Sequence, residues 1–146
     1  VYRTQVDVVL RNGCTVLNAS DEIVASLAEL SDGEVIFFAA DPACPALAEH
    51  IAAGKRGIFV RDGRITLATG GEEIRLCRLG DVPLIGRQKD PSTIANVLAA
   101  VAAGWALGLT KEVIGTGVKT FGLELPDPAA LLPQSARRSP PVAFRN

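Results

Sequence analysis

The chain has 146 residues, of which 48% are hydrophobic and 21% charged, a composition typical of a globular domain with its own core. Its formal net charge is −1 and aromatic residues make up only 5%, which favours neither a nucleic-acid partner nor binding to an anionic membrane. The three cysteines match neither a zinc spacing nor a disulfide framework, and the single histidine excludes a multi-histidine metal site. We therefore expect no metal site and the reduced, buried thiols of a cytoplasmic protein.

The N-terminal residues leave their secondary structure open. Val6, Val8 and Leu10 alternate as they would in a strand, whereas Val6 and Leu10, with Tyr2 and Val9, also share one face of a helix. The sequence contains no Met and begins with Val, so we expect it to be a processed product or a piece of a longer protein.

The next stretch predicts a strand that ends in polar side chains. Residues 15–17 are β-branched or large apolar residues, as in a buried strand. Asn18, Ser20 and Asp21 follow, and each could cap the N-terminus of a helix. Ligands of open α/β sheets bind beyond the carboxyl ends of the strands, so Asn18 is either a plain helix cap or a ligand contact. The residues by themselves leave both interpretations open.

The rest of the first half of the chain alternates between predicted helices and predicted strands. Apolar residues at helical spacing predict a helix over 22–30, the continuous apolar run 35–39 predicts a central strand, and residues 47–51 predict a short helix. This alternation is typical of a parallel sheet. Asp62-Gly63 between two apolar runs then predicts a hairpin, and the alternation around Ile74 adds a third antiparallel strand. We expect this antiparallel sheet to pack beside the parallel one.

Two helices are predicted in the second half. The i, i+3, i+4 spacing of apolar residues over 91–109 predicts a long helix, and Thr110 is placed to cap the next one. The long helix contains Asn96 and too short an apolar run to span a membrane. Thr93 and Asn96 lie three residues apart, on a face other than the apolar stripe, so Asn96 either points into a cleft or satisfies a loop carbonyl.

Two further segments carry polar residues without predicting a site. Residues 115–120 (Gly-Thr-Gly-Val-Lys-Thr) resemble a phosphate loop, but Val118 separates the glycine from the lysine and the pattern is helical. The loop 87–90 could meet a ribose or phosphates, although a solvated loop is the simpler interpretation.

Several of these motifs, taken in order, resemble the central ATPase domain of the family that contains the Mur ligases and cyanophycin synthetase. Residues 16–21 (Val-Leu-Asn-Ala-Ser-Asp) are similar to its "VLN-Ala-Asp-Asp" strand end, and residues 93–100 to its "HN-x-x-N-x-x-AA" helix. Residues 105–109, then Ile114 and Phe121, resemble the "A-x-x-LG" ending and the following "I-x-x-x-L-x-x-F" helix. The likeness runs from about residue 1 to Phe121 and favours a helix at the N-terminus.

The resemblance implies a fold and an activity. The fold would be α/β, with a three-layer, mostly parallel sheet flanked by helices and a small three-stranded antiparallel sheet. The activity would be that of an ATP- and Mg²⁺-dependent ligase, in which ATP phosphorylates a carboxylate and the amine of an amino acid or peptide attacks it. By position, Asn18 and Asn96 would contact the adenine, with Asp21 supporting that loop and Thr93 beside Asn96 completing the nucleotide-binding set. No catalytic residue is assigned.

Departures from the family pattern support a second interpretation. Ser20 replaces the first Asp of the pair, Ser92-Thr93 stand where His-Asn is usual, and no "PGR" segment follows Phe121. No phosphate loop precedes the matched region, so we expect this chain by itself to be inactive. The alternative to a ligase fragment is a non-catalytic, degenerate module of the same fold used for packing or assembly.

The sequence also predicts its organisation. Residues 1–125 would form the C-terminal part of the ATPase domain, and the proline-rich residues 126–146 a disordered tail. Surface that the rest of such a domain would cover should favour a homo-oligomer.

Overall fold

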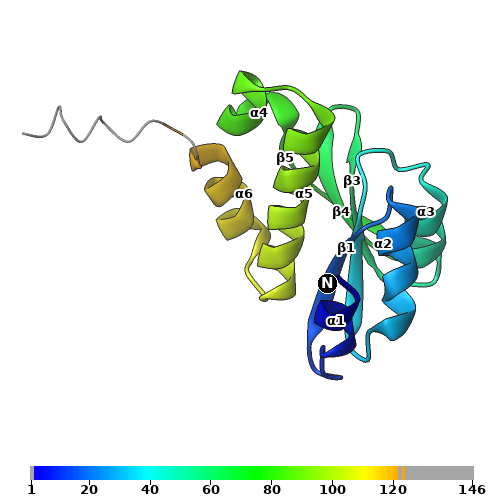
Figure 1. Ribbon diagram of the computed structural model, residues 1–146. Coiled ribbons are helices and arrows are strands. Elements are labelled where there is room, and N and C mark those ends of the chain that lie inside the picture. Colours follow the sequence, from blue (N-terminus) through cyan, green and yellow to red (C-terminus); the bar gives the residue numbers. More distant parts are fainter. Residues whose placement is uncertain (1, 122, 124–146) are drawn as a thin grey trace, which may run out of the picture.

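The computed structural model describes residues 2–121 and residue 123, which form a single five-stranded sheet with helices on both faces (Figure 1). The strands, in both chain and spatial order, are β1 (Cys14–Asn18), β2 (Glu34–Phe38), β3 (Arg56–Arg61), β4 (Arg64–Thr69) and β5 (Glu72–Arg78). β1, β2 and β3 run parallel, and β3, β4 and β5 are antiparallel. The predicted tail, residues 126–146, lies outside the described residues.

The α/β class is therefore confirmed, with one difference in how the sheet is built. The antiparallel strands do not form a second sheet beside the parallel one. β3 pairs with β2 on one side and with β4 on the other, so the two parts are continuous. The sequence of each strand fixes its own pattern, but which strands become neighbours depends on tertiary packing.

The helices divide between the two faces of the sheet. They are α1 (Tyr2–Asp7), α2 (Glu22–Ser26), α3 (Pro45–Ala52), α4 (Pro83–Arg87), α5 (Pro91–Ala106) and α6 (Lys111–Thr120), with the 3-10 turns η1 (Leu27–Leu30) and η2 (Leu79–Asp81). α2 and α3 lie on one face, and α4, α5 and α6 on the other (Figure 1). The helical interpretation of the N-terminal residues, which the resemblance favoured, is confirmed by α1.

Each face of the sheet has its own core. Ile36 and Ile58 are fully buried against Leu98 and Val101 of α5. On the opposite face, Phe37 and Phe59 pack with the fully buried Leu47 of α3. Neighbouring strand residues thus alternate between the two cores, as expected when both faces of a sheet are covered.

The predicted turns and caps are present. Asp62 and Gly63 both have positive φ, 51° and 68°, which a two-residue type I′ hairpin requires. Thr110 caps α6, since its Oγ1 accepts a hydrogen bond of 3.4 Å from the Val113 amide. α6 approaches α5 closely at Gly104, where an added Cβ would lie 3.2 Å from a side-chain carbon of Ile114.

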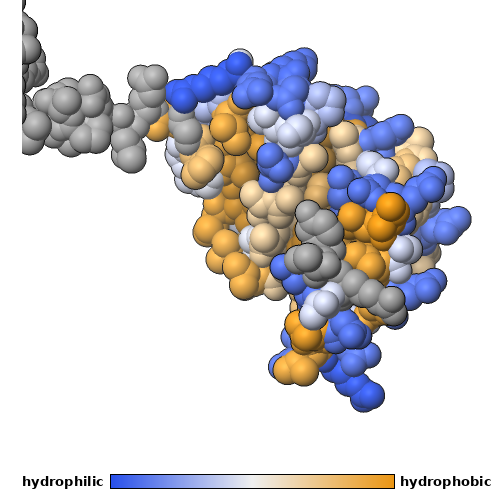
Figure 2. All heavy atoms as spheres, viewed as in Figure 1, coloured by the Kyte–Doolittle hydropathy of each residue, from blue (hydrophilic) through white to orange (hydrophobic). Residues whose placement is uncertain are grey.

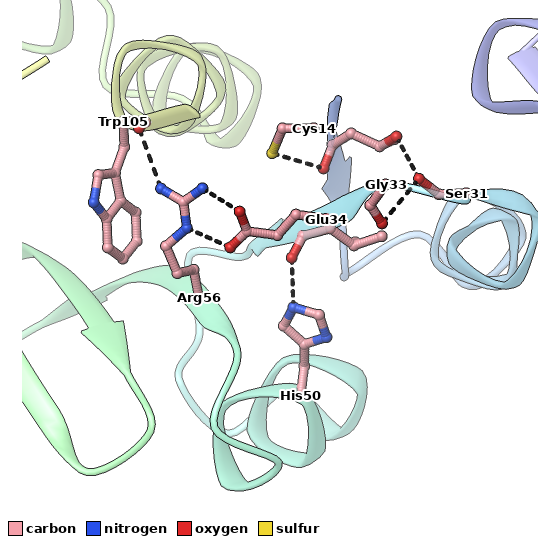
Figure 3. A network of polar contacts seen from close by, with 9 residues as sticks. Cys14, Ser31, Gly33, Glu34, His50, Arg56 and Trp105 are labelled. Carbon is pink, nitrogen blue, oxygen red and sulfur yellow. Dashed lines mark hydrogen bonds and ion pairs between the residues drawn. The ribbon is translucent and has the colours of Figure 1, made fainter. Parts of the chain in front are cut away.

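A charged network that the sequence did not predict ties α5 to the amino ends of the strands (Figure 3). The Arg56 guanidinium donates two hydrogen bonds of 2.6 Å to the carboxylate of Glu34. It also donates to the Trp105 carbonyl, 3.1 Å away, and its carbon lies 4.9 Å from the Trp105 ring centroid. Glu34 begins β2, Arg56 begins β3 and Trp105 lies in the last turn of α5, so one side chain joins three elements.

His50 belongs to the core. Its Nε2 lies 2.8 Å from the Val35 carbonyl oxygen, to which it must donate, and its ring centroid is 4.6 Å from that of Phe37. Burial lowers the pKa of His50 below its ordinary value, which keeps the ring neutral. Cys14, Cys44 and Cys77 are all free thiols, and Cys77 is buried. In the part of the chain that the structure describes, no helix is long and apolar enough to cross a membrane.

The Arg56 network should contribute measurably to stability. Arg56→Ala removes charged hydrogen bonds from a side chain that is only 19% exposed, so we expect unfolding in urea to be easier by about 1–3 kcal/mol. Arg61→Ala is the matched control, because the hydrogen bonds from Arg61 to Glu73 are similarly short, 2.6 and 2.7 Å, but the Arg61 side chain is 45% exposed. It should cost less than about 1 kcal/mol.

The effect of Arg56→Ala on stability should depend on pH. The hydrogen bonds from Arg56 lower the pKa of Glu34, so the contribution of the pair is present above the unfolded-state pKa of Glu34. It is lost as the pH falls through the lower, folded-state pKa. The difference between the chain and Arg56→Ala should therefore shrink in acid, and a difference that stays constant would contradict the ion-pair explanation.

Candidate functional site

The candidate polar residues Asn18 and Asn96 lie toward the end of the sheet opposite to the Arg56 network. The last turn of α5 is fixed at the amino ends of β2 and β3 through Trp105. α5 packs along β1 and β2, so its first turns, which contain Thr93 and Asn96, lie toward the carboxyl ends of those strands. This is the edge at which open α/β sheets bind ligands.

Asn18 is the last residue of β1 and its side chain is oriented by the turn that follows. The Ser20 backbone amide donates a hydrogen bond of 3.0 Å to Asn18 Oδ1. Because a backbone N–H can only donate, the side-chain oxygen faces the turn and the NH₂ group faces away from it. Among the described residues, no acceptor takes a hydrogen bond from that NH₂ group.

Asp21 has a structural role in the same turn. Its Oδ1 accepts hydrogen bonds from the backbone amides of Ile23 (3.0 Å) and Val24 (3.1 Å), so Asp21 is the N-cap of α2. That Asp21 supports a nucleotide-binding loop stays a prediction. The cap fixes the start of α2 and with it the wall formed by Val24.

Asn18 and Asn96 line the same cavity. The cavity has a volume of about 740 Å³ and lies between α1, β1, η1 and α5. Its walls are mainly apolar, with Val16, Phe38 and Ala99 among the lining residues. Volumes of about 300–1,000 Å³ with a few polar groups are typical of small-molecule sites. The sequence predicted these two amides as partners although they are far apart in the chain, and the structure brings them together.

Thr93 does not line this cavity. Its hydroxyl donates a hydrogen bond of 2.7 Å to Asp90 Oδ2, and its backbone amide donates one of 2.9 Å to Asp90 Oδ1. Asp90 is the N-cap of α5, and the hydrogen bond from the Thr93 hydroxyl lowers the pKa of its carboxyl group. Thr93 therefore holds the start of α5, while Asn96, one turn later, is exposed and has no hydrogen-bond partner among the described residues.

The two other polar segments agree with their simpler interpretations. Residues 115–120 lie within α6, as the helical pattern predicted, and do not form a loop. The segment 87–90 joins the end of α4 to the N-cap of α5 and is largely exposed. No group of three residues that could hold a metal ion occurs in the described ranges, 2–121 and 123.

Comparison with known proteins finds relatives that are named ligases and synthetases. The chain is 33% identical to the cyanophycin synthetase of Synechocystis over 115 residues, which cover 79% of this chain and 13% of that protein. The cyanophycin synthetase of Crocosphaera subtropica gives the same values. The UDP-N-acetylmuramoylalanine–D-glutamate ligase of Symbiobacterium thermophilum is 32% identical over 108 residues, covering 71% of this chain and 22% of the ligase. No family model matches the chain.

This chain is homologous to a segment of the cyanophycin synthetases. It is also related to the Mur ligases, and it spans about 13% of the length of the cyanophycin synthetases that it matches. The resemblance seen in the motifs is therefore confirmed, and it extends to the fold.

Homology to the cyanophycin synthetases implies ATP and Mg²⁺. The residues that the structure describes fit the base of ATP but supply no group of ligands for Mg²⁺. The cavity beside Asn18 and Asn96 has the size and apolar walls that suit an adenine ring, and its amides suit the ring edge.

The role of Thr93 leads to a prediction about Asp90. Thr93→Val keeps the shape of the side chain but removes the hydroxyl, so the pKa of Asp90 should rise toward its ordinary value. Thr93→Ser keeps the hydroxyl and should leave that pKa close to its original value. An NMR titration of the Asp90 carboxyl carbon measures both, and an unchanged pKa in Thr93→Val would contradict the assigned bond.

Proposed function

We propose that this chain is part of an ATP-dependent ligase that joins a carboxylate to an amine, and that it forms the adenine side of the ATP site. The observation that supports this proposal is that the side chains of Asn18 and Asn96 line one cavity, which runs along β1 as far as its carboxyl end. The activities of the related cyanophycin synthetases and Mur ligases indicate the reaction class.

The chemistry of the two amides fits this role. An Asn side chain has both a donor and an acceptor, which match the exocyclic amine and ring nitrogens on the edge of adenine. The Asn18 oxygen is already occupied by the Ser20 amide, so Asn18 would donate, whereas Asn96 can both donate and accept. Apolar walls would cover the faces of the ring and exclude water.

The remaining residues would position these contacts without touching the reacting atoms. Asp21 fixes the turn that orients Asn18, and Asp90 with Thr93 fixes the start of the helix that carries Asn96. In the proposed reaction the carboxylate would take the γ-phosphoryl group of ATP and release ADP, and the amine of an amino acid or peptide would then displace phosphate to form the amide. Binding the base in one orientation would hold the phosphates at a defined distance from that carboxylate.

A second function is favoured by one specific observation. Ser20 and Thr93 stand where the family has Asp and Asn, and the Thr93 hydroxyl is committed to Asp90. A module that has lost part of its nucleotide contacts would retain the fold for packing or assembly. ATP binding separates the two proposals, since the degenerate module would not need it.

Single substitutions of the two amides test the proposal. Asn18→Ala and Asn96→Ala should each weaken ATP binding by about 1–3 kcal/mol, because each removes a hydrogen bond to the base. This corresponds to an increase in Kd of about 5- to 150-fold. The measurement is an amide-resolved NMR titration with millimolar ATP, and we expect the shifts in the unsubstituted chain to cluster around both residues.

Asn12→Ala is the matched control, because Asn12 is exposed and precedes β1 at the opposite end of the strand. Adenosine should compete with ATP, whereas inorganic triphosphate should not. Unchanged affinity in both cavity variants would refute the adenine assignment.

We also propose that the chain self-associates and that it functions in the cytoplasm. In the described sheet β1 pairs only with β2, so its other edge has unpaired backbone groups that a second copy could use. Light scattering at increasing concentration should show an average mass above 15.3 kDa. A mass that stays at the monomer value at high concentration would contradict self-association.

A further inference from the structure

A second hollow lies between α4, α5 and α6, on the other side of Asn96 from the Asn18 cavity. It is a groove with a volume of about 490 Å³, and except for Asn96 every residue that lines it is apolar or glycine. Val97 and Ala100 of α5 form one wall, and Val113 and Val118 of α6 form the other. Figure 2 shows apolar residues gathered over α5 and α6. Such a surface fits an apolar occupant and offers little to a charged one.

The apolar side chains at the rim of the groove are unusually exposed to solvent. Leu109, Val113 and Phe121 line it and are 45%, 54% and 71% exposed. Leu107 and Leu123, near the same helix ends, are 80% and 57% exposed. Single exposed apolar residues are normal on a protein surface, but a contiguous group around a groove indicates a binding surface.

The chain itself leaves the described structure at this groove. Phe121 is the C-cap of α6, and the Leu123 amide donates a hydrogen bond of 3.2 Å to the Thr120 carbonyl. Leu123 is the last residue that the structure describes, and the sequence continues for 23 residues beyond it. A segment of the same polypeptide has an effective concentration of millimolar order, so weak apolar contacts are sufficient to hold it.

One part of that continuation matches the groove. Residues 129–132 (Ala-Ala-Leu-Leu) form its longest apolar run and are bounded by Pro128 and Pro133. The prolines restrict the backbone on both sides, which lowers the entropy lost on binding. The charged residues of the continuation all lie outside this run, so none has to enter the uncharged groove; they are Glu124, Asp127, Arg137, Arg138 and Arg145.

The distance also permits this contact. Ala129 follows Phe121 by eight residues, and an extended chain covers about 3.3 Å per residue, or roughly 25 Å. Val113 precedes Phe121 by eight residues in a helix, which rises about 1.5 Å per residue and so spans about 12 Å. The segment can therefore fold back along α6 and reach the whole groove.

We propose that the groove between α5 and α6 binds residues 129–132 of its own chain, with Leu131 and Leu132 inserted between Val97 and Val113. This contact completes the apolar face that α6 leaves open. The proposed contact does not require a bound nucleotide, so it is tested independently of the proposed ATP site.

The test uses the full chain with isotope-labelled Leu and Val methyl groups. We expect nuclear Overhauser contacts between the methyls of Leu131 or Leu132 and those of Leu109, Val113 or Val118. The double variant Leu131→Asp/Leu132→Asp should lose these contacts and shift the groove methyls. Val142→Asp/Phe144→Asp is the matched control, since it places the same two charges on the same segment outside the apolar run, and it should change neither.

A substitution on the groove side gives an independent readout. Val113 is 54% exposed, so Val113→Gln should leave α6 folded, as the amide spectrum of α5 and α6 would verify, while it weakens the same contacts. Contacts that persist unchanged on dilution support binding within one chain. Groove methyl shifts that depend on concentration but not on the Leu131/Leu132 substitutions would assign the groove to a second copy and overturn the proposal, as would the absence of any contact.

Discussion

The packing of α5 across β1 and β2 determines where the candidate site lies. Leu98, Val101 and Ala102 are fully buried against the sheet, so the helix cannot rotate without opening the core. Its C-terminal end is held by the hydrogen bond from Arg56 to the Trp105 carbonyl, and its N-terminal end by the Asp90 cap. With both ends and one face fixed, Asn96 is left on the side of the helix that borders the cavity. The position of one exposed amide thus follows from contacts made by buried residues.

The two ends of the sheet differ in how their polar groups are satisfied. At the amino end, Glu34 and Arg56 satisfy each other with short hydrogen bonds, and His50 is neutral and bound to a backbone carbonyl. At the carboxyl end, the hydrogen bonds of Asn18, Asp21 and Thr93 serve the backbone and the helix caps. They leave amide groups directed at an apolar cavity. In a network that only stabilises the fold, each polar group normally has a hydrogen-bond partner, whereas unpaired polar groups beside a cavity indicate ligand contacts.

Local sequence predicted the parts of this structure that depend on local physics. The Asp62-Gly63 hairpin, the Thr110 cap and the long helix follow from φ preferences, capping and apolar spacing. The alternation in residues 6–10 was compatible with a strand or a helix, and only the family resemblance favoured the helix that is observed. The Glu34–Arg56–Trp105 network could not be predicted, because its members are 22 and 49 residues apart and no local pattern marks them. The same limit explains why the antiparallel strands were expected in a separate sheet.

For the candidate site, the sequence predicted which residues belong together but not the role of each one. The motif predicted four residues as one set, but the geometry separates them into two kinds. Asn18 and Asn96 line the cavity, whereas Asp21 and Thr93 are bound to the backbone and cap that hold it. Both kinds matter for a site, since losing a cap can displace a ligand contact as effectively as deleting it. Asn96 also borders the groove between α5 and α6, so the one helix that carries the proposed base contact has the open apolar surface on its other side. An occupant of that groove would pack against the same turn of α5, which makes the rigidity of the Asn96 position depend on what covers α6.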